Sequence, residues 1–432
     1  MTSPAAPPRE LRLADLLALG VNAVVGSGIF LLPGPLAEKL GPAALVAVVL
    51  AGLAALTIAL CCAEAASRTS ETGGPYLYTT MAFGEGPGLV VGWVSCWTGL
   101  VAWAALASAF VTALAPFTPD AEGRLRPWLL AGLIAGLAAV NVLGARAAAS
   151  LSNLTSILKV GLALAFIALG ISAIDPHRFT PFAPYGFDRL GEAVLLMLYA
   201  YVGFENLVVP AGEMRDPRRH LPVALGAVLA LVAALYLGVQ GVTTGTLPSL
   251  AGEKNGVARA AEAFLGPAGG RMVAAGVLVS ILGVNSASAL VAPRKFYALA
   301  SGGGLPRLLA RLEPRWGTPW VAILFTYAVT WALATTGTFR ELAAATVVGR
   351  LCQYLPTCAA VLALRRQEAQ GRPVESARFR LPGGPAIPLL AIALCGVLLL
   401  SAKPRELVAA GIALATGLPA AWWALRHRRT TS

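Results

Sequence analysis

The sequence predicts an all-α polytopic membrane protein with twelve transmembrane helices, and three observations lead to this fold class. Of the 432 residues, 57% are hydrophobic and 12% are charged, whereas a soluble domain carries about 25% charged residues. The mean hydropathy is +0.72, so too few polar residues remain to cover a soluble surface. The hydrophobic residues also form long runs separated by turn signals. These features exclude ordinary soluble enzymes, disordered proteins and secreted disulfide-rich domains.

Each uninterrupted hydrophobic run is counted as one span, because a helix needs about 20 apolar residues to cross a bilayer. Turn signals such as Asp175-Pro176 and Asp216-Pro217 divide the runs. The connecting loops are too short to fold alone, so we expect a single transmembrane domain over residues 1–432. The predicted spans are 12–37, 42–67, 87–116, 127–147, 152–174, 190–211, 221–246, 270–299, 319–337, 341–364, 386–402 and 405–425.

The positive charges predict the orientation of these spans. With the N-terminus inside, 20 of the 33 Lys and Arg residues fall in cytoplasmic segments and 11 fall on the opposite side, while Lys159 and Arg350 lie within spans. Because Lys and Arg accumulate in cytoplasmic loops, we expect both termini in the cytoplasm and the chain in the cell (inner) membrane, surrounded by lipid. No basic patch alternates with aromatic residues on a soluble segment, so we expect no nucleic-acid partner.

The cysteines and histidines do not predict a metal or cofactor site. All six cysteines lie in apolar stretches without the spacing of metal ligands, and His177, His220 and His427 lie in loops or the tail. We therefore expect neither a metal site nor a cofactor. Catalytic dyads are also missing from the spans, which argues against a membrane-embedded enzyme.

Two spans, the first and the sixth, contain helix-breaking residues near mid-membrane depth. The first carries VGSGI at 25–29, and the sixth carries YVGFEN at 201–206. A break frees backbone N–H and C=O groups that lipid cannot satisfy, so these groups must face a cavity or a ligand. Glycines also allow close helix packing, and a single motif would favour that interpretation. Two breaks five spans apart instead indicate a binding site between two inverted repeats.

Several motifs in order along the chain resemble the amino acid–polyamine–organocation (APC) superfamily of transporters. The first helix carries GSGIFLLPG at 26–34, and the second helix and its exit carry AEAASR at 63–68 and GGPYLY at 73–78. The sixth helix and its exit loop carry YAYVGFE at 199–205 and GEMRDPRRHLP at 212–222. The exit of the eighth helix carries PRKFYALA at 293–300, GLP at 304–306 and GTP at 317–319. The resemblance covers at least residues 11–366.

The resemblance implies a LeuT-like fold, in which a 5+5 inverted repeat contains broken helices 1 and 6. Repeat one would cover about 11–175 and repeat two about 190–364, with two extra C-terminal helices at about 386–425. The carboxylate of an amino acid would lie against the backbone amides of Gly26, Ser27 and Gly28, and its amino group against the carbonyls of Val24 and Val202 beside Gly203. Tyr199 lies where relatives often place an aromatic gate, although core or interfacial packing explains it equally well.

Lys159 is predicted to lie on a polar stripe of the fifth span. Ser152, Thr155, Ser156 and Lys159 follow helical spacing, so they share one face turned towards the bundle. The resemblance implies that the ammonium of this lysine occupies the place of a sodium ion, as in sodium-independent relatives. Its ammonium would then contact the carbonyl of Gly26 and Ser286 or Ser288. A lysine snorkelling to the cytoplasmic interface is the alternative.

Glu205 and Arg350 are the other ionisable residues expected inside the bundle. Glu205 follows the second break, where it would sense a proton or gate the pathway, or would instead cap freed amides. Arg350 would pair with Glu205 or face water, and the sequence leaves both open. Five charged residues are expected at the cytoplasmic mouth of the pathway. They would close the mouth by ion pairs or would form a solvated loop. They are Glu213, Arg215, Asp216, Arg218 and Arg219.

The resemblance therefore implies a secondary active amino acid transporter that works by alternating access, with proton-coupled symport of neutral amino acids. Leu100 follows CWTG at 96–99, where arginine-exchanging relatives carry a side-chain amide, and this departure counts against arginine. A sodium-independent exchanger is the first alternative. An amino acid sensor or channel of the same fold is the second, because binding residues alone do not prove turnover. Oligomeric state does not follow from the sequence.

Overall fold

The computed structural model of the chain describes residues 10–400 except Ser27, Ser70, Thr72, 115–117, Pro119, 254–255 and 337–338, together with residues 411 and 415. Within these residues all regular secondary structure is helical, and Leu11 and Met214 form an isolated parallel β-bridge. The predicted span at 405–425 lies outside the described residues apart from those two positions. The described part is therefore an all-helical bundle, as the composition predicts.

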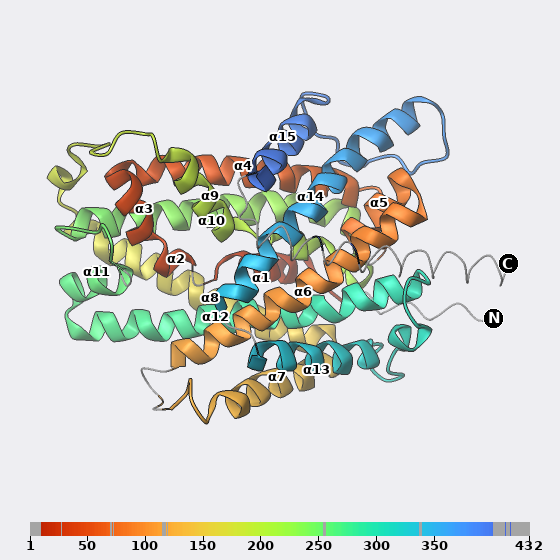
Figure 1. The fold of residues 1–432 in the computed structure, drawn as a ribbon, viewed down its shortest axis with the longest axis horizontal. Helices are drawn as coiled ribbons and strands as arrows, with labels where there is room; N and C mark the ends of the chain where they lie inside the picture. The colour runs from red at the N-terminus through yellow and green to blue at the C-terminus, as the bar shows by residue number, and fades with distance from the viewer. Residues whose placement is uncertain are drawn as a thin grey trace.

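Most of the predicted spans correspond to one helix each (Figure 1). Those with one helix are α4 (Ala44–Ala66), α6 (Glu85–Leu114), α7 (Arg126–Val142), α8 (Ala145–Gly170), α10 (Pro217–Thr246), α12 (Pro267–Ser301), α13 (Trp320–Thr336), α14 (Phe339–Ala369) and α15 (Ala386–Leu400). Two predicted spans are instead interrupted, the first into α1 (Leu13–Val24), α2 (Gly28–Leu31) and α3 (Pro33–Leu40), and the sixth into α9 (Leu190–Tyr201) and the 3₁₀ segment η4 (Phe204–Val208). Two further helices connect spans, α5 (Pro75–Phe83) and α11 (Gly256–Leu265).

The helices have the length and composition of membrane spans. Among the described residues, five helical stretches are long and apolar enough to cross a bilayer, and four shorter apolar helices accompany them. A helix of 23 residues such as α4 is about 35 Å long, which exceeds the hydrocarbon thickness of about 30 Å. The chain is thus a multi-pass membrane protein.

Proline and glycine residues mark the helix ends more accurately than the limits of the apolar runs do. Helix α10 begins at Pro217 and not at the predicted 221, because proline suits the first helical turn. Helix α8 begins at Ala145, seven residues before the predicted 152, since Gly144 adopts φ +120 and an alanine-rich run follows it. Charged and polar residues can therefore belong to a spanning helix beyond its apolar stretch.

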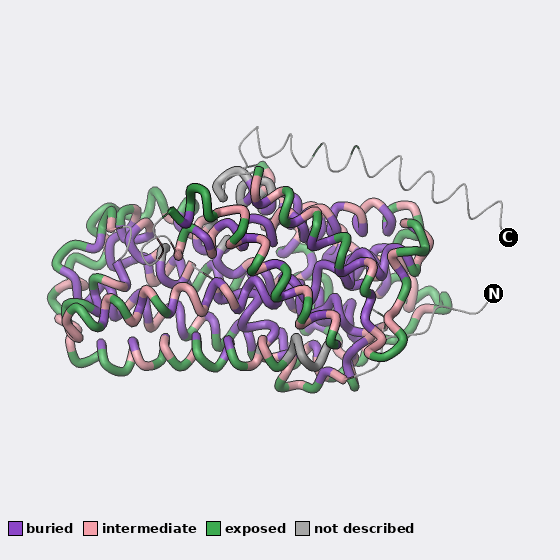
Figure 2. The backbone as a smooth tube through the Cα atoms, turned by 90° about the horizontal axis from the view of Figure 1, so that it is seen from below, coloured by how far each residue is buried: buried purple, intermediate pink, exposed green. Residues whose placement is uncertain are grey.

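The buried hydrophobic residues form two main clusters. The larger one joins α1, α4, α9 and α10, and the second joins α6, α7 and α13. Helices α12 and α14 contribute to both, with Leu290 and Leu351 in the first cluster and Ala289 and Leu342 in the second. Figure 2 shows the buried backbone in the interior of the bundle and the exposed residues on its outer faces. Both interrupted spans thus belong to one packing unit, and the second unit faces them.

Candidate functional site

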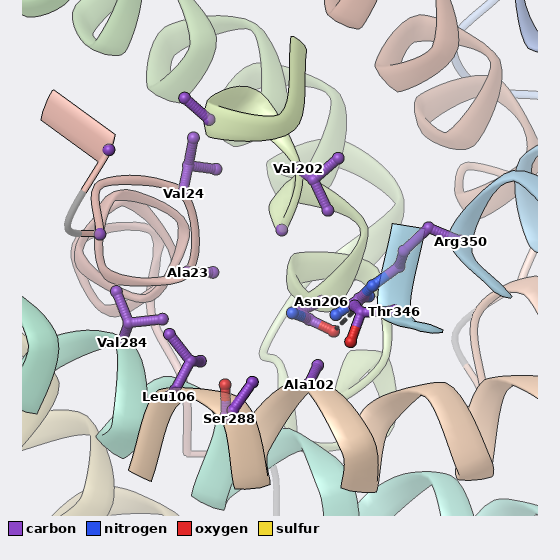
Figure 3. Close-up of a pocket in the computed structure, with 15 residues that line it drawn as sticks. Ala23, Val24, Ala102, Leu106, Val202, Asn206, Val284, Ser288, Thr346 and Arg350 are labelled. Carbon is purple, nitrogen blue, oxygen red and sulfur yellow. Dashed lines mark hydrogen bonds between the residues drawn. The ribbon is translucent and has the colours of Figure 1, made fainter. Parts of the chain in front are cut away.

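A cavity of about 100 Å³ lies between the two interrupted spans (Figure 3). The two breaks contribute one part of its wall, and α6, α12 and α14 contribute the rest. Since a single water needs about 10–15 Å³ of such volume, the cavity has room for roughly seven to ten water-sized groups. Five of the predicted binding residues line it, namely Val24, Gly26, Gly28, Val202 and Gly203. The predicted pairing of the two breaks around one space is therefore present in the fold.

The first break leaves two carbonyl groups without helical partners. Helix α1 ends at Val24, Val25 has extended backbone at φ −75 and ψ 93, and helix resumes at Gly28. The Val25 carbonyl accepts hydrogen bonds from Lys159 Nζ at 2.7 Å and Ser280 Oγ at 3.1 Å. Ser280 Oγ also lies 2.9 Å from the Gly26 carbonyl. Side chains from α8 and α12 thus brace the carbonyl side of this break. Ser27, between the two glycines, lies outside the described residues.

Lys159 is buried as the polar stripe of the fifth span predicts. Its residue exposure is 1%, whereas Ile157 on the opposite face of α8 is 70% exposed. Thr155 and Ser156 are also buried, and the side chain of Ser152 lies outside the described residues. The lysine therefore points into the bundle and does not snorkel to the membrane surface.

The contacts of Lys159 differ from those that the sequence predicts. Its ammonium donates to the carbonyls of Val25 and Ser280, at 2.7 and 3.1 Å, and not to Gly26. The Ser286 hydroxyl donates to Gly283 O of its own helix at 2.8 Å, and Ser288 lines the cavity. The reason is the position of these residues along α12. Lys159 lies beside Ser280, and Ser286 and Ser288 lie about two helical turns further along the same helix.

Gly283 provides the space that the Lys159 ammonium occupies. A Cβ atom at Gly283 would lie 2.8 Å from Lys159 Nζ and 2.4 Å from Asn22 Oδ1. Asn22 in turn donates from Nδ2 to Thr155 Oγ1 at 3.0 Å. Helices α1, α8 and α12 therefore meet around one ammonium group.

The second break depends on the backbone conformation of Gly203. This residue adopts φ +125, which L side chains rarely adopt, and a Cβ atom there would lie 2.1 Å from Ala23 O in α1. Its N–H donates to Glu205 Oε2 at 3.0 Å. The two breaks are thus in direct backbone contact. The Glu205 carboxylate accepts a hydrogen bond from the freed amide of the second break.

Glu205 has three hydrogen-bond donors around its carboxylate. Arg350 forms an ion pair with Oε1, and Tyr354 donates to Oε2 at 2.6 Å next to the amide of Gly203. The side chains of Glu205 and Arg350 are 1% and 6% exposed. Arg350 also donates to Asn206 Oδ1 at 3.3 Å. Arg350 therefore pairs with Glu205, which also caps an amide of the break.

Two tyrosines link the breaks to the first packing unit. Tyr236 Oη on α10 donates to Ala200 O at 3.0 Å and lies 3.4 Å from Val24 O. Tyr201 is fully buried, donates to Val48 O at 3.2 Å and meets the Tyr236 ring edge-on. Tyr201 is thus a packing residue, while the side chain of Tyr199 lies outside the described residues.

Sequence reasoning missed several residues of the site. Thr346 lines the cavity, Tyr236 and Ser280 contact groups that line it, and Tyr354 contacts Glu205. Asn206, within the second break, also lines the cavity. Apart from Asn206, each is a polar residue in a spanning helix, and such a residue at mid-span is the signal that would have found them.

A buried ion pair joins the loop after η4 to α12. Glu213 accepts from Arg294 Nε at 2.7 Å and from a terminal nitrogen at 3.1 Å, and both side chains are under 5% exposed. Leu11 N donates to Glu213 O at 2.9 Å, and Arg215 N donates to Leu11 O at 3.1 Å. Of the two interpretations of this loop, Glu213 therefore follows the ion-pair one. Its partner on α12 was not predicted.

Comparison with known proteins agrees with the motifs. The profile of the amino acid permease family matches residues 11–418. The branched-chain amino acid permease BcaP of Bacillus subtilis is 29% identical over 91% of this chain and 88% of its own length. The serine/threonine exchanger SteT of the same species is 29% identical over 95% and 94%. Cationic amino acid transporter 4 of Mus musculus is 30% identical over 87% of this chain and 62% of its own length.

Proposed function

This chain belongs to the amino acid permease family, a family of transporters and not of enzymes, and on that premise we propose a secondary active transporter of neutral amino acids. It would work by alternating access in the cell membrane, coupled to protons. Its relatives are named for branched-chain, hydroxylated and cationic substrates, so similarity at this level does not select a substrate. The observation that carries the proposal is the cavity between the two helix breaks.

The topology that we propose has twelve spans, with repeats at about 11–175 and 190–364 and two further helices at about 386–425. Both termini would be cytoplasmic, because the basic residues are concentrated in the segments on that side. The buried Glu213–Arg294 pair would then close the cytoplasmic mouth.

In the proposed binding mode the backbone of the breaks recognises the part common to all amino acids. The amides of Gly26, Ser27 and Gly28 would donate to the carboxylate, because backbone N–H groups at the start of a helix suit an anion. The ammonium would lie near the carbonyls of Val24 and Val202, beside Gly203. The cavity brings Gly26, Gly28, Val24 and Val202 around one space, which supports this mode. Tyr199 would close over the substrate.

Lys159 is the leading candidate for coupling in this proposal. Its ammonium donates to two carbonyl groups that belong to the first break and to α12, which is the type of ligand that a bound cation prefers. A change in its protonation would alter the bond to Val25 and therefore the shape of the break. Ser286 and Ser288 would act on the same helix α12, and Glu205 is the second candidate because its carboxylate contacts the other break.

The two packing units provide the moving parts of the proposed cycle. The unit containing α1, α4, α9 and α10 would rock against the unit containing α6, α7 and α13, while the cavity stays between them. Helices α12 and α14 contribute to both units and would act as hinges.

A second candidate function is obligatory exchange without a driving ion. The hydrogen bonds from Lys159 to carbonyl groups favour it, since a permanently charged lysine would occupy a cation site and remove the need for an ion.

Uptake of labelled amino acids into proteoliposomes tests both candidates. Vesicles should be empty or preloaded with amino acid, with and without an inward pH gradient. Accumulation in empty vesicles that depends on the gradient is expected for the symporter. Uptake only into preloaded vesicles, independent of pH, would establish the exchanger. Binding without uptake in any condition would indicate a sensor, and downhill flux that saturates poorly would indicate a channel.

A further inference from the structure

The cavity has chemically different sides. Close to the breaks its wall consists of backbone and small apolar side chains such as Ala23 and Val24. On the side away from Ala23 and Val24, Asn206, Thr346 and Arg350 lie together (Figure 3). We call these three residues the polar wall. If the breaks bind the carboxylate and ammonium of an amino acid, the polar wall is where its side chain lies.

The polar wall carries no net charge despite its arginine. Arg350 is the only ionisable residue among the described residues that line the cavity, and Glu205 neutralises it from behind. Both side chains are buried, so their charges are poorly screened by water. A second carboxylate at Arg350 would leave one negative charge uncompensated at low dielectric. The pair therefore disfavours acidic substrates.

The polar wall still has an unused hydrogen-bond donor. The Glu205 oxygens accept from Arg350, Tyr354 and the Gly203 amide, and Asn206 Oδ1 accepts from Arg350. The Thr346 hydroxyl donates within α14, to Leu342 O at 2.9 Å. By contrast, the buried Arg350 Nε has no hydrogen-bond partner among the residues that the structure describes. A buried donor without a partner is destabilising, so a substrate acceptor that reaches it would be stabilised.

We propose that the polar wall is a side-chain subsite for small, uncharged amino acids whose side chains carry a hydrogen-bond acceptor, namely a hydroxyl or a carboxamide. Arg350 is the specificity-determining residue. Glu205 is a positioning residue, and its carboxylate neutralises the charge that Arg350 brings to the polar wall. This assignment rests on the proposed amino acid transport. The cavity of about 100 Å³ limits the side chain to a few heavy atoms.

Two isosteric pairs of amino acids test the assignment in the wild-type protein. Threonine and valine differ by a hydroxyl in place of a methyl, and asparagine and aspartate differ by one charge. In competition against labelled substrate, threonine should bind at least tenfold more tightly than valine, because a site built for a hydroxyl discriminates against an analogue that lacks it. Asparagine should bind at least tenfold more tightly than aspartate. Equal or better binding of valine would overturn the proposal.

Charge variants provide the decisive readout. Glu205→Gln leaves Arg350 unpaired and positive, so the preference for asparagine over aspartate should fall at least tenfold or reverse. In the double variant Glu205→Gln with Arg350→Met, the wall is neutral again, so aspartate should be rejected again. The threonine preference over valine should be lost there. An unchanged asparagine-to-aspartate ratio in the single variant, or an unchanged threonine-to-valine ratio in the double variant, would overturn the assignment.

A control variant separates these effects from general damage. Glu213→Gln also removes a buried carboxylate from an arginine pair, but Glu213 pairs with Arg294 away from the cavity. It should slow transport of all substrates alike and leave both ratios unchanged. If no amino acid is bound or transported by the wild type, amino acid transport itself fails and the subsite with it. If transport occurs without these preferences, only the subsite is wrong.

Discussion

The two helix breaks expose opposite backbone groups, and the protein compensates them in opposite ways. At the first break, carbonyl groups accept hydrogen bonds from the ammonium of Lys159 and from Ser280. At the second, an amide donates to the carboxylate of Glu205, which Arg350 neutralises. The cation at the first break is thus held by dipoles, while the charges at the second are already paired. The difference teaches that freed carbonyl groups and a freed amide require side chains of opposite charge.

The largest expected effect comes from the contact between the breaks. Gly203→Ala should abolish transport and destabilise the protein by about 3 kcal/mol, because the residue has φ +125 and its new Cβ would lie 2.1 Å from Ala23 O. Thermal unfolding in detergent and vesicle uptake would measure both effects. Gly191→Ala in α9, within the same interrupted span, is the matched control, since its Cβ would meet nothing within 4 Å. Normal uptake by the Gly203 variant would show that the breaks do not need this contact.

Filling the first break should remove binding with less effect on stability. Gly28→Val places its side chain against Ala200, whose Cβ already lies 3.1 Å from the Cβ position of residue 28, and it occupies cavity volume. We expect substrate affinity to fall by more than 100-fold, measured by equilibrium binding. Gly26→Ala is a milder comparison, because its nearest neighbour, Val284, would be at 3.5 Å. Unchanged affinity in the Gly28 variant would place the substrate elsewhere.

Removing the cation tests whether the first break carries the coupling. Lys159→Ala should abolish net transport while some substrate binding remains, because the Val25 and Ser280 carbonyls lose their donor. Uptake driven by a pH gradient and binding of labelled substrate should be measured side by side. Wild-type rates in this variant would rule out the coupling role and make the two breaks equivalent.

A smaller and more specific effect is expected from moving the cation without removing it. Gly283→Ala would place a methyl group 2.8 Å from Lys159 Nζ, so the flexible lysine must shift. We expect net transport to fall several-fold and the free energy of unfolding to fall by about 1–3 kcal/mol, because the new methyl group would also lie 2.4 Å from Asn22 Oδ1. Gly161→Ala on α8 is the control, as nothing lies within 4 Å of its Cβ position. Equal rates in both variants would show that the position of the ammonium is not critical.

The positions of the two helix breaks could be predicted from the sequence, because a backbone requirement leaves a signal in the composition. Gly26, Gly28 and Gly203 stand out in apolar runs, and all three line the cavity. The burial of Lys159 followed from helical spacing. The partners of Lys159 did not follow, because the register between α8 and α12 depends on packing distances that spacing within one helix cannot supply.

By itself the sequence determined that this chain is a helical membrane protein, where its helices break and which face of α8 is polar. These properties arise from local backbone preferences and from the transfer of side chains between water and lipid. Tertiary structure alone decided that Arg350 pairs with Glu205, that Tyr236 reaches both breaks, and that Ser280 meets Val25. Those contacts join residues from 36 to 255 positions apart. Their geometry depends on how whole helices pack, which no local pattern encodes.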